Sequence, residues 1–262
     1  MYQTQFVRDE FLERVHASRR SALLLDYDGT LAPFQEQRDA ALPYPEVKAI
    51  LADIMASTST RVVIVSGRAA NEVVQLLGLA PAPEVWGAHG LERLSPDGSL
   101  RLGRIDRRSA RAIADAVRWA KEHGWEQHLE CKPGGIALHW RGVPSAEAEQ
   151  MYRSAMDTLL PLTRASRLGL AEFDGGLELR VRNCNKGHVV DEIAREMGDA
   201  PIAYLGDDRT DEDAFRALQG RGLTVLVRQE LRPTSAELWL RPPDELMHFL
   251  HDWLNASRGE RK

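Results

Sequence analysis

Three stretches of this chain repeat one pattern: a short apolar run, then polar residues, then residues with apolar side chains at helical spacing. The apolar runs lie at residues 23–25, 62–65 and 202–205 and consist mainly of leucine, valine and isoleucine. Runs that are apolar throughout, without alternation, are typical of strands buried on both faces of a parallel sheet. With helices predicted at residues 71–77 and 212–218, the pattern indicates an α/β fold built on a Rossmann-like parallel sheet.

The middle of the chain has a different pattern. Its predicted elements are two amphipathic helices, each followed by a hairpin with a glycine-containing turn, in the order 108–125, 128–142, 145–162 and 169–182. Helix–hairpin–helix–hairpin is an α+β arrangement. We therefore predict an inserted α+β domain at residues 104–182, carried by a core made of residues 1–103 and 183–262.

Charge and composition narrow the class of partner. The chain has 34 basic and 39 acidic residues, a net charge of −5, and no long run of lysine or arginine, which argues against nucleic acid as a partner. No apolar stretch reaches the roughly 18 residues of a membrane-spanning helix, and the first twenty residues lack the apolar segment of a signal peptide. We expect a monomeric cytoplasmic protein that binds no membrane, with Cys131 and Cys184 buried or half-buried rather than in a disulfide or zinc site.

Polar residues directly follow each of the three apolar runs. They are Asp26 and Asp28 after the first, Ser66, Gly67 and Arg68 after the second, and Asp207, Asp208 and Asp211 after the third. Ligands bind beyond the carboxyl ends of parallel strands, so these residues are expected to converge. Converging carboxylates repel one another unless a cation binds them, and oxygen ligands without histidine or cysteine favour Mg²⁺ over zinc.

Structural interpretations compete with a metal site. The residues from Asp26 to Thr30 would also suit an ordinary turn. The acidic residues after the third run would also cap the helix near Glu212, and Asp211 is the one expected to do so. A calcium-binding EF-hand loop is excluded, because the sixth position counted from Asp26 is Leu31 rather than glycine.

An aspartate is a recognised nucleophile toward phosphorus and forms an aspartyl-phosphate. We expect Asp26 to be this nucleophile, and Asp28 to protonate the leaving oxygen and then activate water. Ser66, the amides around Gly67, and Lys186 would stabilise charge on the phosphoryl group. The predicted metal ligands are Asp26, Asp28 and Asp207, supported by Asp208 and Asp211, which are not expected to touch the ion.

The ordered set of motifs over residues 21–215 resembles the haloacid dehalogenase superfamily of phosphotransferases: Asp-x-Asp-Gly-Thr, Ser-Gly, a lysine, then Gly-Asp-Asp-x-x-Asp. The insertion resembles the larger cap domain of that superfamily. The stretches LLLDYDGTLAPF, VSGR, GAHGLE, LECKPGGIALHWR, LELRVRNCNKG and YLGDDRTDEDAFRAL further resemble the trehalose-6-phosphate phosphatase family. The resemblance implies a Mg²⁺-dependent phosphatase that releases trehalose and phosphate from trehalose 6-phosphate. The predicted substrate contacts are Thr30, Gly67 and Arg68 in the core, and Glu130, Lys132 and Glu178 in the cap.

The chain departs from the family pattern at Asn185, where aspartate is common, near Val181, where a proline is common, and at Leu91 within HGLE, where alanine is common. These departures leave open a phosphatase or mutase of another sugar phosphate, such as glucosyl- or mannosyl-phosphoglycerate or sucrose phosphate. A non-enzymatic phospho-receiver domain is the other alternative, and Asp28 argues against it because receivers lack that second acid. Glu130 and Lys132 would otherwise be an exposed cross-strand pair of little energetic weight.

Overall fold

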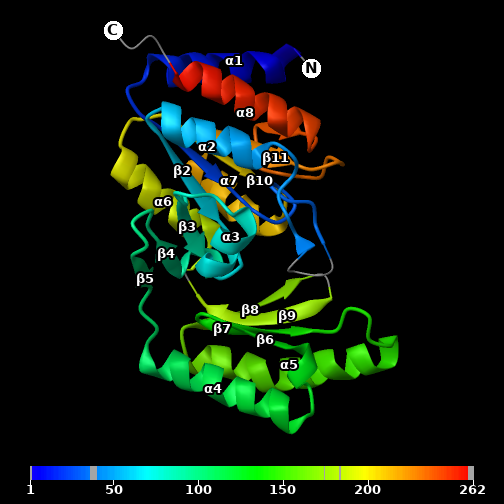
Figure 1. The fold of residues 1–262 in the computed structure, drawn as a ribbon. Helices are drawn as coiled ribbons and strands as arrows, with labels where there is room; N and C mark the ends of the chain where they lie inside the picture. Colours follow the sequence, from blue (N-terminus) through cyan, green and yellow to red (C-terminus); the bar gives the residue numbers. More distant parts are fainter. Residues whose placement is uncertain (1, 36–39, 174, 183, 259–262) are drawn as a thin grey trace. The chain divides into compact units, whose positions relative to one another are not determined.

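The computed structural model describes residues 2–35, 40–173, 175–182 and 184–258. The chain divides into two compact units (Figure 1). Met1–Arg101 together with Asn185–Lys262 form the first, here the core unit, and Leu102–Cys184 form the second, here the inserted unit.

The core unit contains an eight-stranded sheet with the strand order β12-β11-β10-β1-β2-β3-β4-β5. From β12 to β3 neighbouring strands pair in parallel, and β4 pairs antiparallel with β3. The strands are β1 Ser21–Leu25, β2 Thr60–Val65, β3 Glu84–Gly87, β4 Glu92–Leu94, β5 Leu100–Leu102, β10 Ile202–Gly206, β11 Leu223–Val227 and β12 Leu238–Leu240. The predicted parallel α/β sheet is confirmed, and the leucine-rich run forms a central strand of it.

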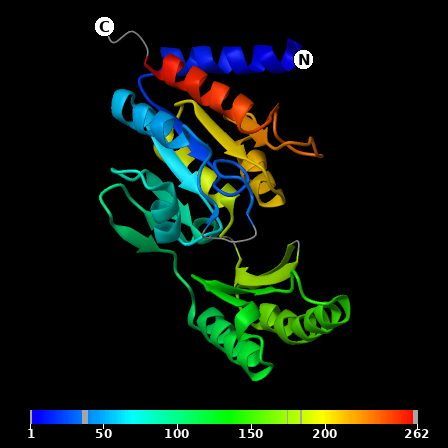
Figure 2. The same cartoon turned by 45° about the vertical axis from the view of Figure 1, so that its right-hand side comes forward.

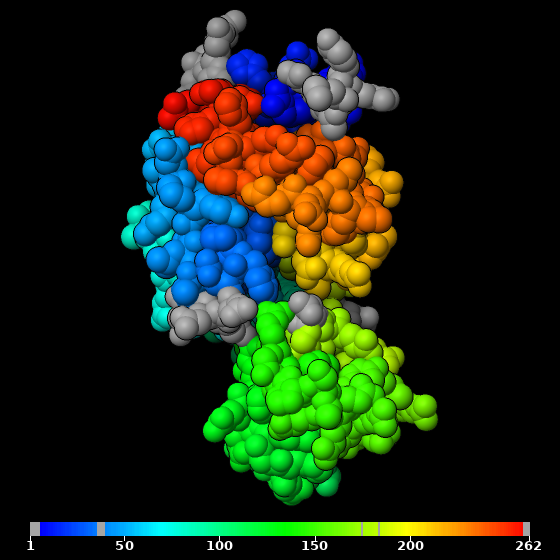
Figure 3. All heavy atoms as spheres, turned by 90° about the vertical axis from the view of Figure 1, so that its right-hand side faces the viewer, coloured from blue at the N-terminus to red at the C-terminus, as the bar shows by residue number. Residues whose placement is uncertain are grey.

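Helices cover both faces of this sheet, which explains why residues 22–25 of β1 are all apolar. Leu23 and Leu25 pack into a cluster with residues of α1, α2, α3 and α8, whereas Leu24 faces α6 and α7. Burying each leucine contributes roughly 1.5–3 kcal/mol. Helix α8 contacts both α1 and α2 (Figure 3). The helices are α1 Tyr2–Ala17, α2 Val47–Ser57, α3 Ala70–Leu77, α6 Lys186–Met197, α7 Glu212–Leu218 and α8 Asp244–Ser257, with 3₁₀ turns at Ala88–Gly90 and Arg209–Asp211.

The inserted unit is a four-stranded antiparallel sheet with two helices on one face (Figure 2). Its strand order is β6-β7-β9-β8. Leu177 and Leu179 pack against the helices, so Glu178, between them on the strand, lies on the opposite face. The elements are α4 Arg107–Glu122, a 3₁₀ turn Glu126–His128, β6 Leu129–Lys132, β7 Gly135–His139, α5 Ser145–Ala165, β8 Leu168–Phe173 and β9 Gly176–Val181. This is the predicted order of helices and hairpins.

Neither cysteine is in a disulfide. Cys184 is half-buried, as expected, but the expectation for Cys131 is wrong, because this residue is exposed. It lies on β6, an edge strand of the inserted sheet, where only one neighbouring strand covers it. Among the described residues, no helix has the length and apolar character needed to span a membrane.

Candidate active site

Three loops meet at the carboxyl ends of the neighbouring strands β10, β1 and β2. Asp26 follows β1, and its backbone N–H donates to the carbonyl of Leu205 in β10 at 2.9 Å. Ser66 follows β2, and Asp207 follows β10. Because the three strands are adjacent and parallel, their loops share one edge of the sheet. The structure thus brings these predicted site residues to the same edge.

Three carboxylates form a cluster at this edge. One oxygen of each of Asp26, Asp207 and Asp211 lies within 4.8 Å of the other two. Burial raises the pKa of Asp26 to about 7, although the nearby ammonium of Lys186 opposes this rise. Burial, followed by repulsion from Asp26 and Asp211, raises the pKa of Asp207 well above its ordinary value. Positive charge is therefore needed to keep the whole cluster ionised at neutral pH.

Lys186 supplies one such charge from the first turn of α6. Its Nζ donates to Asp26 Oδ1 at 2.6 Å and to Asp211 Oδ1 at 2.7 Å. Burial alone would lower the pKa of Lys186, but the two carboxylates outweigh it and the net pKa is raised. The preceding residue, Asn185, begins the helix by accepting a hydrogen bond from the His188 N–H at 2.9 Å, so α6 starts where its lysine reaches the cluster.

Asp211 organises the loop after β10. Its Oδ1 accepts from the Tyr204 hydroxyl at 2.6 Å, and its Oδ2 accepts from the backbone N–H groups of Asp207 and Asp208 at 3.1 and 2.9 Å. Asp211 occupies the N-cap position of α7, as expected, but its side chain makes no capping hydrogen bond to that helix. It instead closes the capping box of the preceding 3₁₀ turn, whose N-cap is Asp208. The Asp211 side chain packs directly against Gly206. A Cβ at that position would lie only 2.3 Å from Asp211 Cγ, so the glycine leaves the room that the carboxylate occupies.

The cluster suits a magnesium ion. Its donors are carboxylate oxygens, which Mg²⁺ prefers, and Asp207 Oδ1 is buried without a hydrogen-bond partner among the described residues. Gly29 leaves room for this carboxylate: it has a left-handed backbone (φ 84°), and a Cβ there would lie 2.1 Å from Asp207 Oδ2. Thr30 Oγ1 donates to Asp26 Oδ2 at 3.2 Å, which orients the carboxylate. The residues present therefore fit a hard divalent cation.

Asp28 lies in the same loop, but the structure does not bring its carboxylate into the cluster. Both of its oxygens accept hydrogen bonds from Arg68, with Nε and Nη2 each at 2.7 Å. Arg68 also contacts Glu72, which lies in the first turn of α3. Sequence position alone placed Asp28 among the metal ligands, whereas its observed side-chain partner is this guanidinium.

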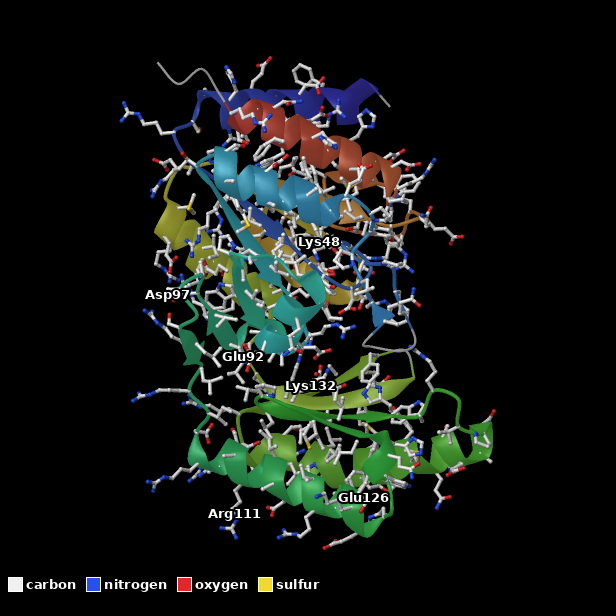
Figure 4. The ribbon with its side chains drawn as sticks, viewed as in Figure 1. Lys48, Glu92, Asp97, Arg111, Glu126 and Lys132 are labelled. Atoms are coloured by element: carbon white, nitrogen blue, oxygen red, sulfur yellow. The ribbon has the colours of Figure 1, made fainter. Side chains whose placement is uncertain are left out.

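Glu92 is a buried residue for which the sequence predicted no role. It lies on β4 (Figure 4), and its Oε2 accepts from the Ala70 N–H at the start of α3 at 2.7 Å. A Cβ at Gly87 would lie 2.8 Å from that oxygen, so the carboxylate fits only against glycine. Glu92 thereby anchors the loop that carries Ser66 and Arg68. The only available signal was its presence in the quoted stretch GAHGLE.

In the inserted unit, the predicted sugar-binding residues lie together on one face of the sheet. Glu130 and Glu178 are both register partners of Ala137, from the two sides of β7. Lys132 is labelled in Figure 4. Its Nζ lies 2.9 Å from Glu178 Oε1 and 3.8 Å from Glu130 Oε2. The Glu130 carboxylate also contacts His139, with its Oε2 2.9 Å from His139 Nε2. The structure brings the three residues into one ionic group on the face that carries no helix of this unit.

Solved structures with the same fold define the class. A haloacid dehalogenase-like hydrolase from Bacteroides thetaiotaomicron matches 88% of this chain with a TM-score of 0.67 and 12% identity, over 98% of its own chain. The C-terminal domain of Candida albicans trehalose-6-phosphate phosphatase matches 96% of this chain with a TM-score of 0.75 and 21% identity, over 97% of its own. The fold is therefore that of haloacid dehalogenase-like hydrolases.

Sequence comparison then identifies the family. The trehalose-phosphatase family model matches residues 24–241, so the chain belongs to the trehalose-phosphatase family. A probable trehalose-phosphate phosphatase G of Arabidopsis thaliana is 28% identical, over 93% of this chain and 71% of that protein. A trehalose-phosphate phosphatase of Mycobacterium marinum is 31% identical, over 88% of this chain and 60% of that protein.

Proposed function

We propose that this protein is a Mg²⁺-dependent phosphatase that hydrolyses trehalose 6-phosphate to trehalose and phosphate. The observation that carries the proposal is the position of Asp26: a buried carboxylate at the carboxyl end of a central strand, 2.6 Å from Lys186 and clustered with Asp207 and Asp211. Membership of the trehalose-phosphatase family supports trehalose 6-phosphate as the substrate.

In the proposed mechanism, a carboxylate oxygen of Asp26 attacks phosphorus, and the bond from phosphorus to the sugar oxygen breaks. Asp28 gives its proton to that leaving oxygen, so trehalose departs as the neutral alcohol. Asp28, now ionised, takes a proton from water, whose oxygen attacks phosphorus and releases Asp26. Lys186 holds Asp26 and offsets the charge of the phosphoryl group.

The remaining core residues bind and orient the phosphoryl group in this proposal. The Ser66 hydroxyl and the amides around Gly67 would donate to its oxygens, and Thr30 holds the second oxygen of Asp26 at 3.2 Å. Asp26 and Asp207 would hold Mg²⁺. When bound, the ion supplies the positive charge that keeps the carboxylates ionised and offsets charge on the phosphoryl oxygens.

The inserted unit is proposed as the cap that binds the sugar, with the core at residues 1–103 and 183–262 and the cap at 104–182. Glu130, Lys132 and Glu178 offer both hydrogen-bond acceptors and a donor, which suits sugar hydroxyls. Their mutual ion pairs keep this polar face ordered in the absence of a sugar. We place the protein in the cytoplasm as a monomer, in keeping with its two free thiols.

The decisive variant is Asp26→Asn. An amide is a poor nucleophile and a poor Mg²⁺ ligand, so phosphate release from trehalose 6-phosphate should fall to background. Circular dichroism should show the same fold, because the substitution preserves the shape of the side chain. EDTA should likewise abolish wild-type activity, and added Mg²⁺ should restore it. Activity near the wild-type level in Asp26→Asn, or undiminished activity in EDTA, would contradict the mechanism.

A screen of phosphate release across sugar phosphates tests the substrate separately. Trehalose 6-phosphate should give the highest kcat/KM. Preference for sucrose phosphate or a glycosyl-phosphoglycerate would replace the substrate but keep the chemistry. Transfer of phosphate to another position of the sugar, without free phosphate, would identify a mutase.

A further inference from the structure

Arg68 lies between two carboxylates just after β2. Its Nε and Nη2 donate to the two oxygens of Asp28 at 2.7 Å each, and Nη1 donates to Glu72 Oε1 on α3. The guanidinium thus makes a two-bond contact with one acid and a single contact with the other. A planar guanidinium suits this arrangement, whereas an ammonium could not form the paired contact.

The arginine itself is held firmly. It is 5% exposed, and its guanidinium carbon lies 5.9 Å from the centre of the Tyr27 ring. Its backbone N–H donates to Ser66 Oγ at 3.1 Å, and its carbonyl accepts from the Ala88 N–H at 2.7 Å. The Asp28 side chain, by contrast, is 31% exposed. The fixed member of the pair is therefore the arginine, and the acid is the member that can turn.

We propose that Arg68 is a positioning residue that fixes where the Asp28 carboxylate lies, and that Glu72 is the partner the guanidinium keeps when Asp28 turns toward the leaving group. This inference rests on the proposed role of Asp28 as acid and base. It replaces direct substrate binding, the role expected for Arg68 from sequence, with an action through Asp28.

The geometry shows why a second partner is needed. Each Asp28 oxygen accepts one hydrogen bond from Arg68. A carboxyl oxygen that carries the acid proton is a poor acceptor, so both bonds persist only while Asp28 is ionised. One of these bonds has to open during the reaction. Glu72 keeps the buried guanidinium paired at that moment, since an unpaired buried charge would be costly. Arg68 keeps all its protons throughout, and two protons move: one from Asp28 to the leaving oxygen, and a second from water to Asp28.

Substituted phenyl phosphates separate positioning from substrate binding and involve no sugar. A poor leaving group such as phenol needs a proton from a positioned acid, whereas 4-nitrophenol leaves readily without one. In Arg68→Ala, kcat/KM should fall about 10-fold to 100-fold for phenyl phosphate, part of the effect of general acid catalysis. It should fall less than about 3-fold for 4-nitrophenyl phosphate. Arg68→Lys should resemble Arg68→Ala, because a lysine cannot form the paired contact.

Glu72 is tested by a double-mutant cycle. Glu72→Gln should lower kcat/KM for phenyl phosphate in the wild-type background, and should add no further loss in the Arg68→Ala background, because it acts through the arginine. The matched control is Arg61→Ala. Arg61 lies on the same strand, β2, and donates to Glu84 Oε2 at 2.9 and 2.8 Å, so its loss removes a comparable pair without touching Asp28. The control should leave the dependence on leaving group unchanged.

Equal losses on all phenyl phosphates, together with weaker inhibition by inorganic phosphate, would show that Arg68 binds the phosphoryl group directly and would overturn the inference. A parallel change in the Arg61→Ala control would show that the effect is one of folding, and would overturn it too. A wild-type protein that hydrolyses phenyl phosphates but not trehalose 6-phosphate would refute the proposed substrate and leave the role of Arg68 intact.

Discussion

At the scale of single residues, Lys186 is a buried cation between two acids. It is 3% exposed, and its two contacts of 2.6 and 2.7 Å join Asp26 to Asp211. Removing one member of a buried ionic group leaves the others without a partner, which typically costs about 3–5 kcal/mol. The lysine therefore stabilises the fold of the site, in addition to its proposed role in the chemistry.

Lys186→Ala should lower kcat for trehalose 6-phosphate by about 100-fold or more, with a smaller effect on KM. The reason is that its charge offsets negative charge that develops during phosphoryl transfer. Steady-state kinetics at saturating Mg²⁺ test this, and thermal unfolding at the same Mg²⁺ concentration verifies that the variant is folded. A change confined to KM would mean that the lysine only helps to bind substrate.

At the scale of elements, an ionic group joins α6 to three strands of the core sheet. Arg61 of β2 and Arg93 of β4 each contact both Glu84 of β3 and Glu196 of α6, at 2.7–2.9 Å. The hydrogen bond from Arg93 lowers the pKa of Glu196 below its ordinary value of 4.5, with a further contribution from Arg61, although partial burial opposes the shift. This group joins the last turn of α6 to the sheet, at the opposite end of the helix from Lys186.

A lowered pKa in the folded state means that ionised Glu196 stabilises the protein above pH 4.5, the ordinary value. That stabilisation is lost as the pH falls through the lower folded-state pKa. Glu196→Gln should therefore be less stable than wild type at pH 7, by on the order of 1 kcal/mol or less since the pair is partly exposed. The difference should shrink as the pH falls below 4.5, through the lowered folded-state pKa. Urea unfolding across this range measures it, and a difference that does not change with pH would contradict the prediction.

At the scale of the whole molecule, the proposed function places chemistry and sugar recognition in separate units. The carboxylate cluster lies entirely in the core unit, and Glu130, Lys132 and Glu178 lie entirely in the inserted unit. Substitutions in one unit should therefore leave the intrinsic capacity of the other intact. Binding energy from the sugar, remote from phosphorus, can still contribute to catalysis of the natural substrate.

Alanine at Glu130, Lys132 or Glu178 should lower kcat/KM for trehalose 6-phosphate by about 10-fold to 1000-fold, the effect of losing charged hydrogen bonds of ~1.5–3 kcal/mol. Hydrolysis of 4-nitrophenyl phosphate should stay near the wild-type rate. Arg153→Ala is a matched control, because its ion pair with Glu149 lies on α5 of the same unit, away from this face. Equal losses on both substrates would point to folding, and no loss on either would leave these residues as a surface ion pair.

The sequence determined which segments become strands and helices wherever a local pattern was strong. The uniform apolar character of β1, β2 and β10 predicted a sheet covered on both faces, and the acidic loop residues predicted an anionic edge, because burial and turn preferences act over a few residues. Short or weakly patterned elements such as β4 Glu92–Leu94, β5 Leu100–Leu102 and β12 Leu238–Leu240 were not predicted. They are specified by their neighbours in the fold.

Only the tertiary structure decided which side chains of these loops touch. Lys186 contacts Asp26 across 160 residues of sequence, and Arg68 contacts Asp28 across 40. The sequence favoured Asp28 as a metal ligand and placed Asp211 outside the ligand set, yet Asp28 contacts a guanidinium and Asp211 lies inside the carboxylate cluster. The difference arises from packing: Gly206 and Gly29 let the backbone approach Asp211 and Asp207 closely, and such close approach depends on atoms that the chain brings together only when folded.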